Sequence, residues 1–214
     1  MIEINNITKV YKKGTDKFTA LGNVSFKIGK GDYVSITGPS GAGKSTLLYT
    51  LGGLIRPDSG EIMINGVSLY DQNSRYLDRY RKRDVGFMFQ QFHLMPYLTV
   101  LDNIRFNCSE KSRNKNINDL LEKCSIMAVR NKYPSELSVG EKQRTAFIRA
   151  IISDPEILLA DEPTGNLDPE NSFVLMTLIE EFHKKGGTVI LVSHNPDATK
   201  YSNLNISLEK GKII

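Results

Sequence analysis

The stretch that decides the fold of this 214-residue chain is Gly38-Pro-Ser-Gly-Ala-Gly-Lys-Ser-Thr46. It matches the phosphate-binding pattern G-x-x-x-x-G-K-[ST] at its four fixed positions, Gly38, Gly43, Lys44 and Ser45. Glycines there let successive backbone N–H groups turn toward one anion, and the start of a following helix adds the positive end of its dipole. The stretch therefore predicts a polyphosphate site, with Lys44 reaching the β- and γ-phosphates and the Ser45 hydroxyl ligating Mg²⁺.

The residues on either side have the pattern that this motif requires. Residues 33–37 before it predict a short strand, and residues 45–51 after it predict the first turns of a helix. A glycine-rich turn matches these four positions by accident in roughly one chain in a hundred at average residue usage. The strand before the motif and the helix after it favour a nucleotide site instead.

The composition excludes several classes of protein. With 40% hydrophobic residues the chain can bury a core, and its net charge of +4 is too small for a nucleic-acid-binding surface, so we expect no nucleic-acid partner. Cys108 and Cys124 lack metal-type spacing, which predicts ordinary thiols in a reducing cytosol. The N-terminus lacks signal-peptide features and no apolar run has the length of a membrane span, so a membrane role would require a partner.

Strands and helices are predicted to alternate along most of the chain. The predicted strands are residues 2–11, 20–28, 33–37, 61–65, 85–89, 157–160 and 188–192, with a polar turn over 12–17, and the predicted helices are 45–51, 73–83, 117–127, 140–153 and 169–185. The continuous apolar runs 157–160 and 188–192 suit strands buried on both faces of a parallel sheet. We therefore expect an α/β fold with a mostly parallel core sheet, an N-terminal antiparallel β subdomain, and a small α-helical lobe inserted at about residues 91–153.

Polar side chains follow three of these strands, at the sheet edge where such folds bind ligands. Asp161 and Glu162 come directly after one apolar run, His194 follows the other, and Gln90 ends a third strand. Asp161 fits a carboxylate that supports a metal ion, and Glu162 fits a base that polarises a water for in-line attack on a γ-phosphate, with His194 beside it. Each residue alone is as readily an ordinary exposed or structural one. Their convergence beside a phosphate loop favours catalysis.

A second informative stretch is Leu137-Ser-Val-Gly-Glu141. Ser138 and Glu141 have the spacing of a capping box, which explains both structurally, and Asp168-Pro169 reads as an N-cap followed by proline at the first helical position. The same geometry leaves a hydroxyl and backbone N–H groups at a helix start, which makes a second anion site. A chain with two such sites suggests that two copies pair head to tail across two nucleotides.

Taken in order, these motifs resemble the ABC transporter ATPase family over essentially the whole chain. The resemblance is carried by the phosphate loop, Phe89-Gln90, residues 137–141 with the following Lys-Gln-Arg, residues 157–162, Asn166-Leu-Asp168 and His194. It implies a P-loop NTPase fold in a single domain over residues 1–214, hydrolysis of ATP with Mg²⁺, and two ATPs held between two subunits, with an identical second subunit expected. It also implies a transmembrane permease as partner and a peripheral location on the cytoplasmic face of the membrane.

The family pattern implies a role for each motif residue. Tyr11 would stack on adenine, although an aromatic residue beside a lysine-rich turn equally suits surface packing. The residues implied to bind phosphates are Gly38, Ser40, Gly41, Ala42, Gly43, Lys44, Ser45 and Thr46. Ser45 and Gln90 are implied to ligate Mg²⁺, with Asp161 behind them. Glu162 is implied to be the catalytic base and His194 the γ-phosphate switch, and Gln90 also belongs to the catalytic set. The residues implied to act across the dimer are Ser138, Gly140 and Asp168.

Three shorter strings resemble the family branch that contains lipoprotein-release, macrolide-export and cell-division ATPases; they are residues 51–54, 134–138 and 160–168. The helical lobe is short for this branch. Val139 also departs from the family pattern, which usually has glycine there. Because valine resists positive φ and adds bulk beside the phosphate, we expect ATP binding with slow hydrolysis by the chain alone.

Two other functions remain open. One is a soluble ABC-type ATPase of repair or translation, although such proteins usually carry two cassettes or a coiled-coil insertion. The other is a nucleotide-gated binding module that closes on ATP without useful hydrolysis, which Val139 favours and the intact Glu162 and His194 oppose. A GTPase is disfavoured because the chain has no Asn-Lys-x-Asp string.

Overall fold

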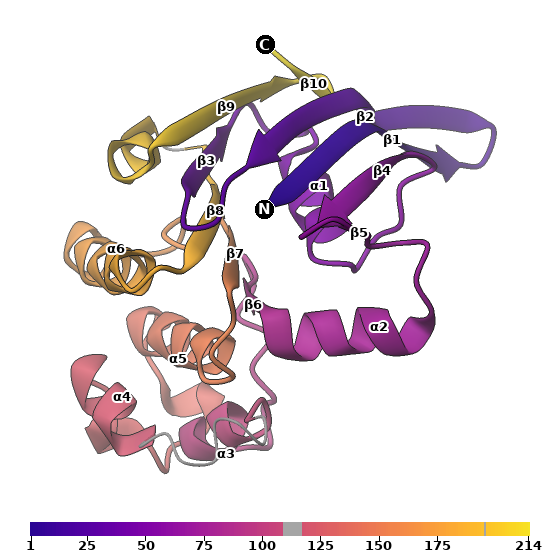
Figure 1. Cartoon of the computed structure of the whole chain (residues 1–214). Helices are drawn as coiled ribbons and strands as arrows, with labels where there is room; N and C mark the ends of the chain where they lie inside the picture. The colour runs from indigo at the N-terminus through magenta and orange to yellow at the C-terminus, as the bar shows by residue number, and fades with distance from the viewer. Residues whose placement is uncertain (109–116, 195) are drawn as a thin grey trace.

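The computed structural model describes residues 1–108, 117–194 and 196–214, which form two sheets with helices packed around them (Figure 1). The polar link that the sequence predicts over residues 108–116 lies, except for Cys108, outside the described residues. In the three described segments, none of the helices combines the length and the apolar character that crossing a bilayer requires.

The N-terminal strands form the predicted antiparallel sheet. β1 (Ile2–Lys13) and β2 (Asp16–Ile28) make a long hairpin, and β4 (Ser59–Ile64) and β5 (Val67–Ser68) extend it in the order β2-β1-β4-β5. The hairpin turn is tighter than the sequence predicts, since only residues 14 and 15 separate the strands. Tyr11 pairs with Phe18 in this register, so the two aromatic side chains stand side by side near the hairpin end.

The second sheet is mostly parallel, as predicted. Its order is β10-β9-β3-β8-β7-β6, and only the pair of β9 and β10 is antiparallel. The strands are β3 (Tyr33–Thr37), β6 (Val85–Met88), β7 (Ile157–Asp161), β8 (Thr188–Val192), β9 (Leu204–Glu209) and β10 (Lys212–Ile213). β3 and β8 have the predicted bounds, whereas β9 and β10 were not predicted.

Helices lie on both faces of the parallel sheet (Figure 1). They are α1 (Lys44–Leu51), α2 (Ser74–Arg79), α3 (Val100–Arg105), α4 (Ile117–Lys123), α5 (Val139–Ile151) and α6 (Pro169–Lys184), with 3₁₀ turns at Met127–Val129, Pro134–Glu136 and Pro196–Tyr201. α1 contacts β7 and β8 of the large sheet and β2 of the small one, while α5 and α6 pack together on the opposite face. The bounds of the helical lobe at residues 91–153 stay a prediction.

One helix departs from its predicted form. The helix expected over residues 73–83 is α-helical only to Arg79 and continues as a π-helical turn over Tyr80–Asp84. The buried Tyr80 hydroxyl donates to the Leu51 carbonyl oxygen at 2.9 Å, at the end of α1. The wider turn therefore coincides with a tertiary contact that local sequence does not reveal.

The hydrophobic core lies on both faces of the parallel sheet. In β7, Ile157 and Leu159 pack toward α1 and the antiparallel sheet, while Leu158 and Ala160 pack toward the helices on the other face. All five residues of β7 and of β8 are buried. This burial confirms the prediction from the two continuous apolar runs, and it holds the carboxyl ends of both strands in place.

Candidate functional site

The phosphate loop joins β3 to α1, and two of its glycines are required by neighbouring backbone. Gly38 has φ 147° and Gly43 has φ 101°. A Cβ atom at Gly38 would lie 2.0 Å from the Leu208 carbonyl oxygen of β9, and one at Gly43 would lie 2.1 Å from the Ala20 carbonyl oxygen of β2. The loop is therefore held between a strand of each sheet, and only glycine fits at these two positions.

Lys44 begins α1 and is buried within the loop. Its Nζ donates to the carbonyl oxygens of Gly38 and Pro39 at 2.8 and 3.0 Å. Among the described residues, no side chain caps the start of α1, and its first turn contains no acidic residue. The loop thus presents uncapped backbone N–H groups, the positive end of the helix dipole and one ammonium group together, which is an arrangement that binds phosphates.

Ser45 of α1 and Asp161 at the end of β7 meet at the sheet edge, where the Ser45 hydroxyl donates to Asp161 Oδ1 at 3.0 Å. Asp161 Oδ2 is buried and has no hydrogen-bond partner in the described segments. Burial raises the pKa of Asp161 because the charged form loses its water, while the hydroxyls of Tyr49 and Ser45 act in the opposite direction. A hydroxyl beside a carboxylate oxygen that lacks a partner is an oxygen donor set that fits Mg²⁺.

Glu162 and His194 lie within hydrogen-bond distance, with Glu162 Oε2 2.8 Å from His194 Nδ1. The Glu162 side chain is only 10% exposed, whereas that of His194 is 66% exposed. Glu162 has φ 47°, a left-handed conformation that is costly for this residue, and its N–H donates to the Val192 carbonyl oxygen of β8 at 2.9 Å. Neighbouring backbone therefore helps fix a strained residue whose side chain faces the loop, as is frequent at functional sites.

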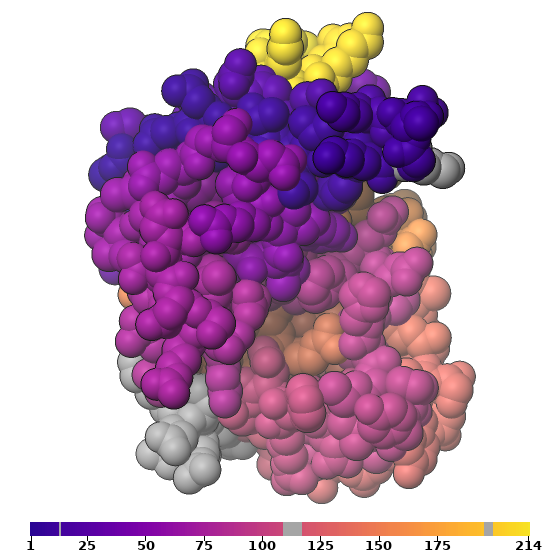
Figure 2. Space-filling model, turned by 90° about the vertical axis from the view of Figure 1, so that its right-hand side faces the viewer, coloured from indigo at the N-terminus to yellow at the C-terminus, as the bar shows by residue number. Residues whose placement is uncertain are grey.

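These residues line one open pocket of about 320 Å³. The predicted site residues that line it are Tyr11, Ser40, Gly41, Ala42, Gly43, Lys44, Ser45, Thr46, Gln90, Glu162 and His194. Gly38 and Asp161 support the lining through their bonds to Lys44 and Ser45. Figure 2 shows a hollow on this part of the molecule, between the indigo and purple N-terminal strands and the pink and orange segments below them.

Sequence reasoning missed two lining residues, Phe18 and Ala20 of β2. Phe18 is a large apolar side chain, 57% exposed, beside Tyr11. The signal that identifies it is the hairpin register, because a tighter turn than expected brings Phe18 opposite Tyr11. Both aromatic rings therefore stand at the same edge of the pocket.

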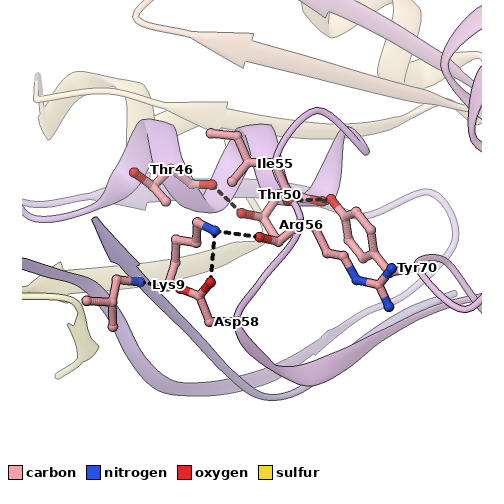
Figure 3. A network of polar contacts seen from close by, with 8 residues as sticks. Lys9, Thr46, Thr50, Ile55, Arg56, Asp58 and Tyr70 are labelled. Atoms are coloured by element: carbon pink, nitrogen blue, oxygen red, sulfur yellow. Dashed lines mark hydrogen bonds and ion pairs between the residues drawn. The ribbon is translucent and has the colours of Figure 1, made fainter. Parts of the chain in front are cut away.

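The strand that carries Tyr11 is anchored to the loop after α1 (Figure 3). Lys9 Nζ donates to the Arg56 carbonyl oxygen at 2.9 Å and to Asp58 Oδ1 at 3.2 Å, and the Val10 N–H donates to Asp58 Oδ2 at 2.7 Å. The Val10 N–H and the Lys9 ammonium hold the pKa of Asp58 below its usual range. Lys9 Nζ also lies 5.9 Å from the centroid of the Tyr11 ring. These contacts fix β1 at the pocket edge.

The same loop is tied back to α1. The Tyr70 hydroxyl lies 2.6 Å from the carbonyl oxygens of both Thr50 and Ile55, and the Thr50 hydroxyl donates to the Thr46 carbonyl oxygen at 2.6 Å (Figure 3). Thr46 lines the pocket. One polar network therefore connects the phosphate end of the pocket to the Tyr11 end.

Ser138, Gly140 and Asp168 are placed differently. Ser138 caps α5 in the predicted capping box, since its Oγ accepts from the Glu141 N–H at 3.3 Å and the Glu141 carboxylate accepts from the Ser138 N–H at 2.7 Å. Asp168 caps α6 by accepting from the Asn171 N–H at 2.8 Å, and this bond lowers its pKa. None of the three is among the described residues that line the pocket.

Val139 does not have the backbone strain that the sequence analysis expected. It is the first residue of α5 and is absent from the described residues with positive φ, so valine is accommodated without that cost. Its side chain is 42% exposed. The expected conformational penalty is therefore wrong, and only the added bulk at the helix start remains.

A second hollow, a groove of about 290 Å³, is lined by Phe89, the residue directly before Gln90 of the pocket. It is lined mainly by apolar and aromatic side chains, with Arg81 and Arg149, and includes Phe87, Phe89, Met95 and Phe106. Arg149 donates to the carbonyl oxygens of His93 and Phe92 at 2.5 and 2.7 Å. Phe89 faces this groove while the next residue, Gln90, lines the pocket, so adjacent residues connect the two hollows.

Comparison with known proteins places the chain in one family. The family model described as ABC transporter matches residues 21–165. An uncharacterized ABC transporter ATP-binding protein of Methanocaldococcus jannaschii is 42% identical over the whole chain and 98% of its own length. The lipoprotein-releasing system ATP-binding protein LolD of Buchnera aphidicola is 37% identical over the whole chain and 96% of its length.

A solved structure shows the same fold. The chain matches a dimeric ABC transporter cassette from Methanocaldococcus jannaschii with a TM-score of 0.92 and 36% identity, over the whole chain and 96% of that cassette. The same cassette has been solved as a dimer in a post-hydrolysis state bound to ADP and Pi. These matches confirm the resemblance drawn from the motifs. The chain belongs to the ABC transporter family, as an ATP-binding and ATP-hydrolysing subunit.

Proposed function

We propose that two copies of this chain enclose two ATP molecules and that their hydrolysis drives a membrane-embedded transporter of the exporter or lipoprotein-release type. The proposal rests chiefly on one observation: the phosphate loop, the Asp161 carboxylate and the Glu162–His194 pair converge on a single pocket. The likeness to a dimeric cassette and to LolD supports the pairing and the type of partner.

The pocket residues divide the chemistry among them. The uncapped start of α1 and Lys44 bind the β- and γ-phosphates, and Tyr11 stacks on the base. Ser45, Gln90 and Asp161 hold Mg²⁺, with which the orphaned Asp161 Oδ2 is compatible. When bound, that ion supplies positive charge to the phosphate oxygens.

Glu162 acts as the base in this scheme. Its carboxylate takes a proton from a water whose oxygen bonds to the γ-phosphorus, while the bond from that phosphorus to the β–γ bridging oxygen breaks and ADP leaves. His194 Nδ1 lies 2.8 Å from Glu162 Oε2. Because that contact occupies the carboxylate, ATP must draw the exposed His194 toward the γ-phosphate before Glu162 can orient a water.

The second copy completes each site. Ser138 and Gly140 at the start of α5, with Asp168 at the start of α6, would face the nucleotide held by the other chain. We further propose that the apolar groove beside Phe89 docks a cytosolic segment of the permease, which would hold the subunit on the cytoplasmic face of the membrane. Its supporting observation is the direct succession of Phe89 and Gln90, which gives a docked segment a path to the pocket.

The test compares phosphate release by the native chain and by Glu162→Gln, and sizes both with ATP and Mg²⁺. Glu162→Gln should lower the rate by about 100-fold or more while keeping ATP binding, since general bases contribute about 10²–10⁴-fold, and it should elute as an ATP-dependent dimer. Glu122→Gln, an exposed residue of α4, is the control. If neither the native chain nor the variant hydrolyses ATP or dimerises, the gated binding module gains support. Co-purification without any membrane protein would favour a soluble ATPase.

A further inference from the structure

The starts of α5 and α6 are joined by one side chain, that of Asn171. Its Nδ2 donates to Asp168 Oδ2 at 2.7 Å, and its Oδ1 accepts from Arg144 Nη1 at 2.5 Å. Its backbone N–H also donates to Asp168 Oδ1 at 2.8 Å. The amide therefore bonds Asp168 at the start of α6 on one side and α5 on the other.

The same amide lies directly against Gly140. A Cβ atom at Gly140 would lie 2.5 Å from Asn171 Oδ1 and 3.2 Å from Arg144 Nη1. Gly140 is absent from the described glycines with positive φ, so its backbone conformation does not itself require glycine. A Cβ atom there would therefore require the Asn171 amide to shift, and this close approach puts the amide in contact with the start of α5.

Arg144 depends on this contact for its orientation. Its Nε is buried and has no hydrogen-bond partner in the described segments. Because Nε makes no hydrogen bond, the other N–H groups of the guanidinium must hold it in place. One of them, on Nη1, donates to Asn171 Oδ1. Asn171 thus satisfies Arg144 of α5 and Asp168 of α6 at once, which needs a group that both accepts and donates.

We propose that Asn171 is a positioning residue that holds Asp168 and Gly140 in one fixed relation, so that the starts of α5 and α6 meet a second copy as a single rigid surface. The inference deepens the proposed function and rests on it, because Ser138, Gly140 and Asp168 act across the dimer there. Ser138 is two residues from Gly140 at the same helix start, where its hydroxyl accepts from the Glu141 N–H.

Two substitutions separate this role from packing. Asn171→Leu keeps a similar volume but can neither donate nor accept, so it removes both bonds. Asn171→Asp can still accept from Arg144 but cannot donate to Asp168, and it places two carboxylates side by side. The control is Thr177→Ala on the same helix, because the Thr177 hydroxyl bonds only the Phe173 carbonyl oxygen of α6 itself among the contacts of the described segments.

The first measurement is amide hydrogen exchange in the nucleotide-free chain, after thermal unfolding shows that each variant is folded. Asn171→Leu should raise the exchange rates of the amides of residues 138–143 about tenfold, because local opening of the helix start then lacks its main restraint.

The second measurement is the kinetics of ATP hydrolysis. The rate constant kcat should fall about tenfold while the dissociation constant of ATP for the monomer stays within about twofold, the pattern of a group that acts after ground-state binding. For Asn171→Asp, the exchange rates of the α5 amides should lie between those of Asn171→Leu and the native chain. Its kcat should equal that of Asn171→Leu.

Exchange and kcat for Asn171→Leu equal to those of Thr177→Ala would overturn the inference. If Asn171→Leu fails to fold, the Asn171→Asp variant decides by the same comparison. Failure of the proposed function looks different, because Glu162→Gln with native Asn171 would then stay monomeric with ATP while the exchange difference persisted. That result would keep the link between the helix starts and overturn its role across two copies.

Discussion

The two groups of predicted site residues differ in how the chain builds them. The pocket group comes from β1, the phosphate loop and the ends of β6, β7 and β8, and the fold alone brings it together. The other group, Ser138, Gly140 and Asp168, stands at two helix starts that line no part of that pocket among the described residues. Since a capped helix start still presents an anion-binding end, we infer that one chain carries two halves of different sites.

The sharpest way to break this comparison is to disable each half in a different copy. Lys44→Ala removes the ammonium at the centre of the loop and should lower ATP hydrolysis by about 100-fold or more. Ser138→Arg places a large side chain at the start of α5. It should lower ATP hydrolysis by a similar factor if that surface meets ATP. Mixing the two inactive variants should restore activity, because each mixed dimer contains one site with an intact loop and an intact α5.

The measurement is phosphate release from each variant alone and from equimolar mixtures. About a quarter of native activity is expected in the mixture, since half of the dimers are mixed and each has one of two sites intact, if chains exchange freely. Lys44→Ala mixed with Glu162→Gln is the matched control, because both changes lie in the pocket half and cannot complement. The division into two halves would be contradicted if the mixture of Lys44→Ala with Ser138→Arg showed no ATP hydrolysis, or if both mixtures recovered the same activity.

The pocket half can be sharpened through the stability of the nucleotide-free chain. The raised pKa of Asp161 means that the folded state favours the protonated carboxyl, so stability present at acid pH is lost as pH rises through the folded pKa. Asp161→Asn retains an acceptor for Ser45 and removes the buried charge. We expect it to raise the free energy of unfolding at neutral pH by about 1–3 kcal/mol, with the difference shrinking toward acid pH.

Denaturant unfolding at several pH values, with and without Mg²⁺ and ATP, checks this. Asp161→Asn should also lose the additional stabilisation that Mg²⁺ gives in the presence of ATP, because its oxygen is the proposed support for the ion. Asp16→Asn, exposed at the start of β2, serves as control. A variant less stable than the native chain at neutral pH would mean that the Asp161 carboxylate is well satisfied, and the cation fit would lose its support.

The sequence predicted the pocket half well because its signals are local. The loop pattern, the bounds of β3 and β8, and the polar residues after β7 and β8 follow from neighbouring residues and from strand geometry. Phe18 was missed because its position depends on a hairpin register that no local signal set. β9 was missed although Leu204, Ile206 and Leu208 alternate in it, and its Leu208 is what forces glycine at position 38.

Tertiary contacts decided the remaining departures. The π-helical turn after Arg79 coincides with the bond from Tyr80 to the end of α1, which the local sequence does not specify. The Asn171 amide lies against Gly140, a contact that the family pattern does not reveal because it only names the position. A motif therefore located residues of the second half, but the contact that positions them had to be seen in three dimensions.

Val139 offers the smallest and most local test of the second half. Its helical backbone means that Val139→Gly relieves no strain, and glycine at an exposed first helical position costs up to about 1 kcal/mol relative to alanine. Any gain in rate must then come from removing bulk at a surface that meets the other copy's phosphate. We expect ATP hydrolysis to rise about two- to fivefold, which is small beside the contribution of about 10³-fold or more that a residue supplied by a partner chain makes in comparable enzymes.

Steady-state phosphate release at saturating ATP measures this change in rate. Val139→Ala should give a rate between those of the native chain and Val139→Gly, because alanine keeps one methyl group. An unchanged rate in both variants would mean that the valine side chain lies clear of the nucleotide, and that slow turnover of the isolated chain has another cause, such as the missing permease.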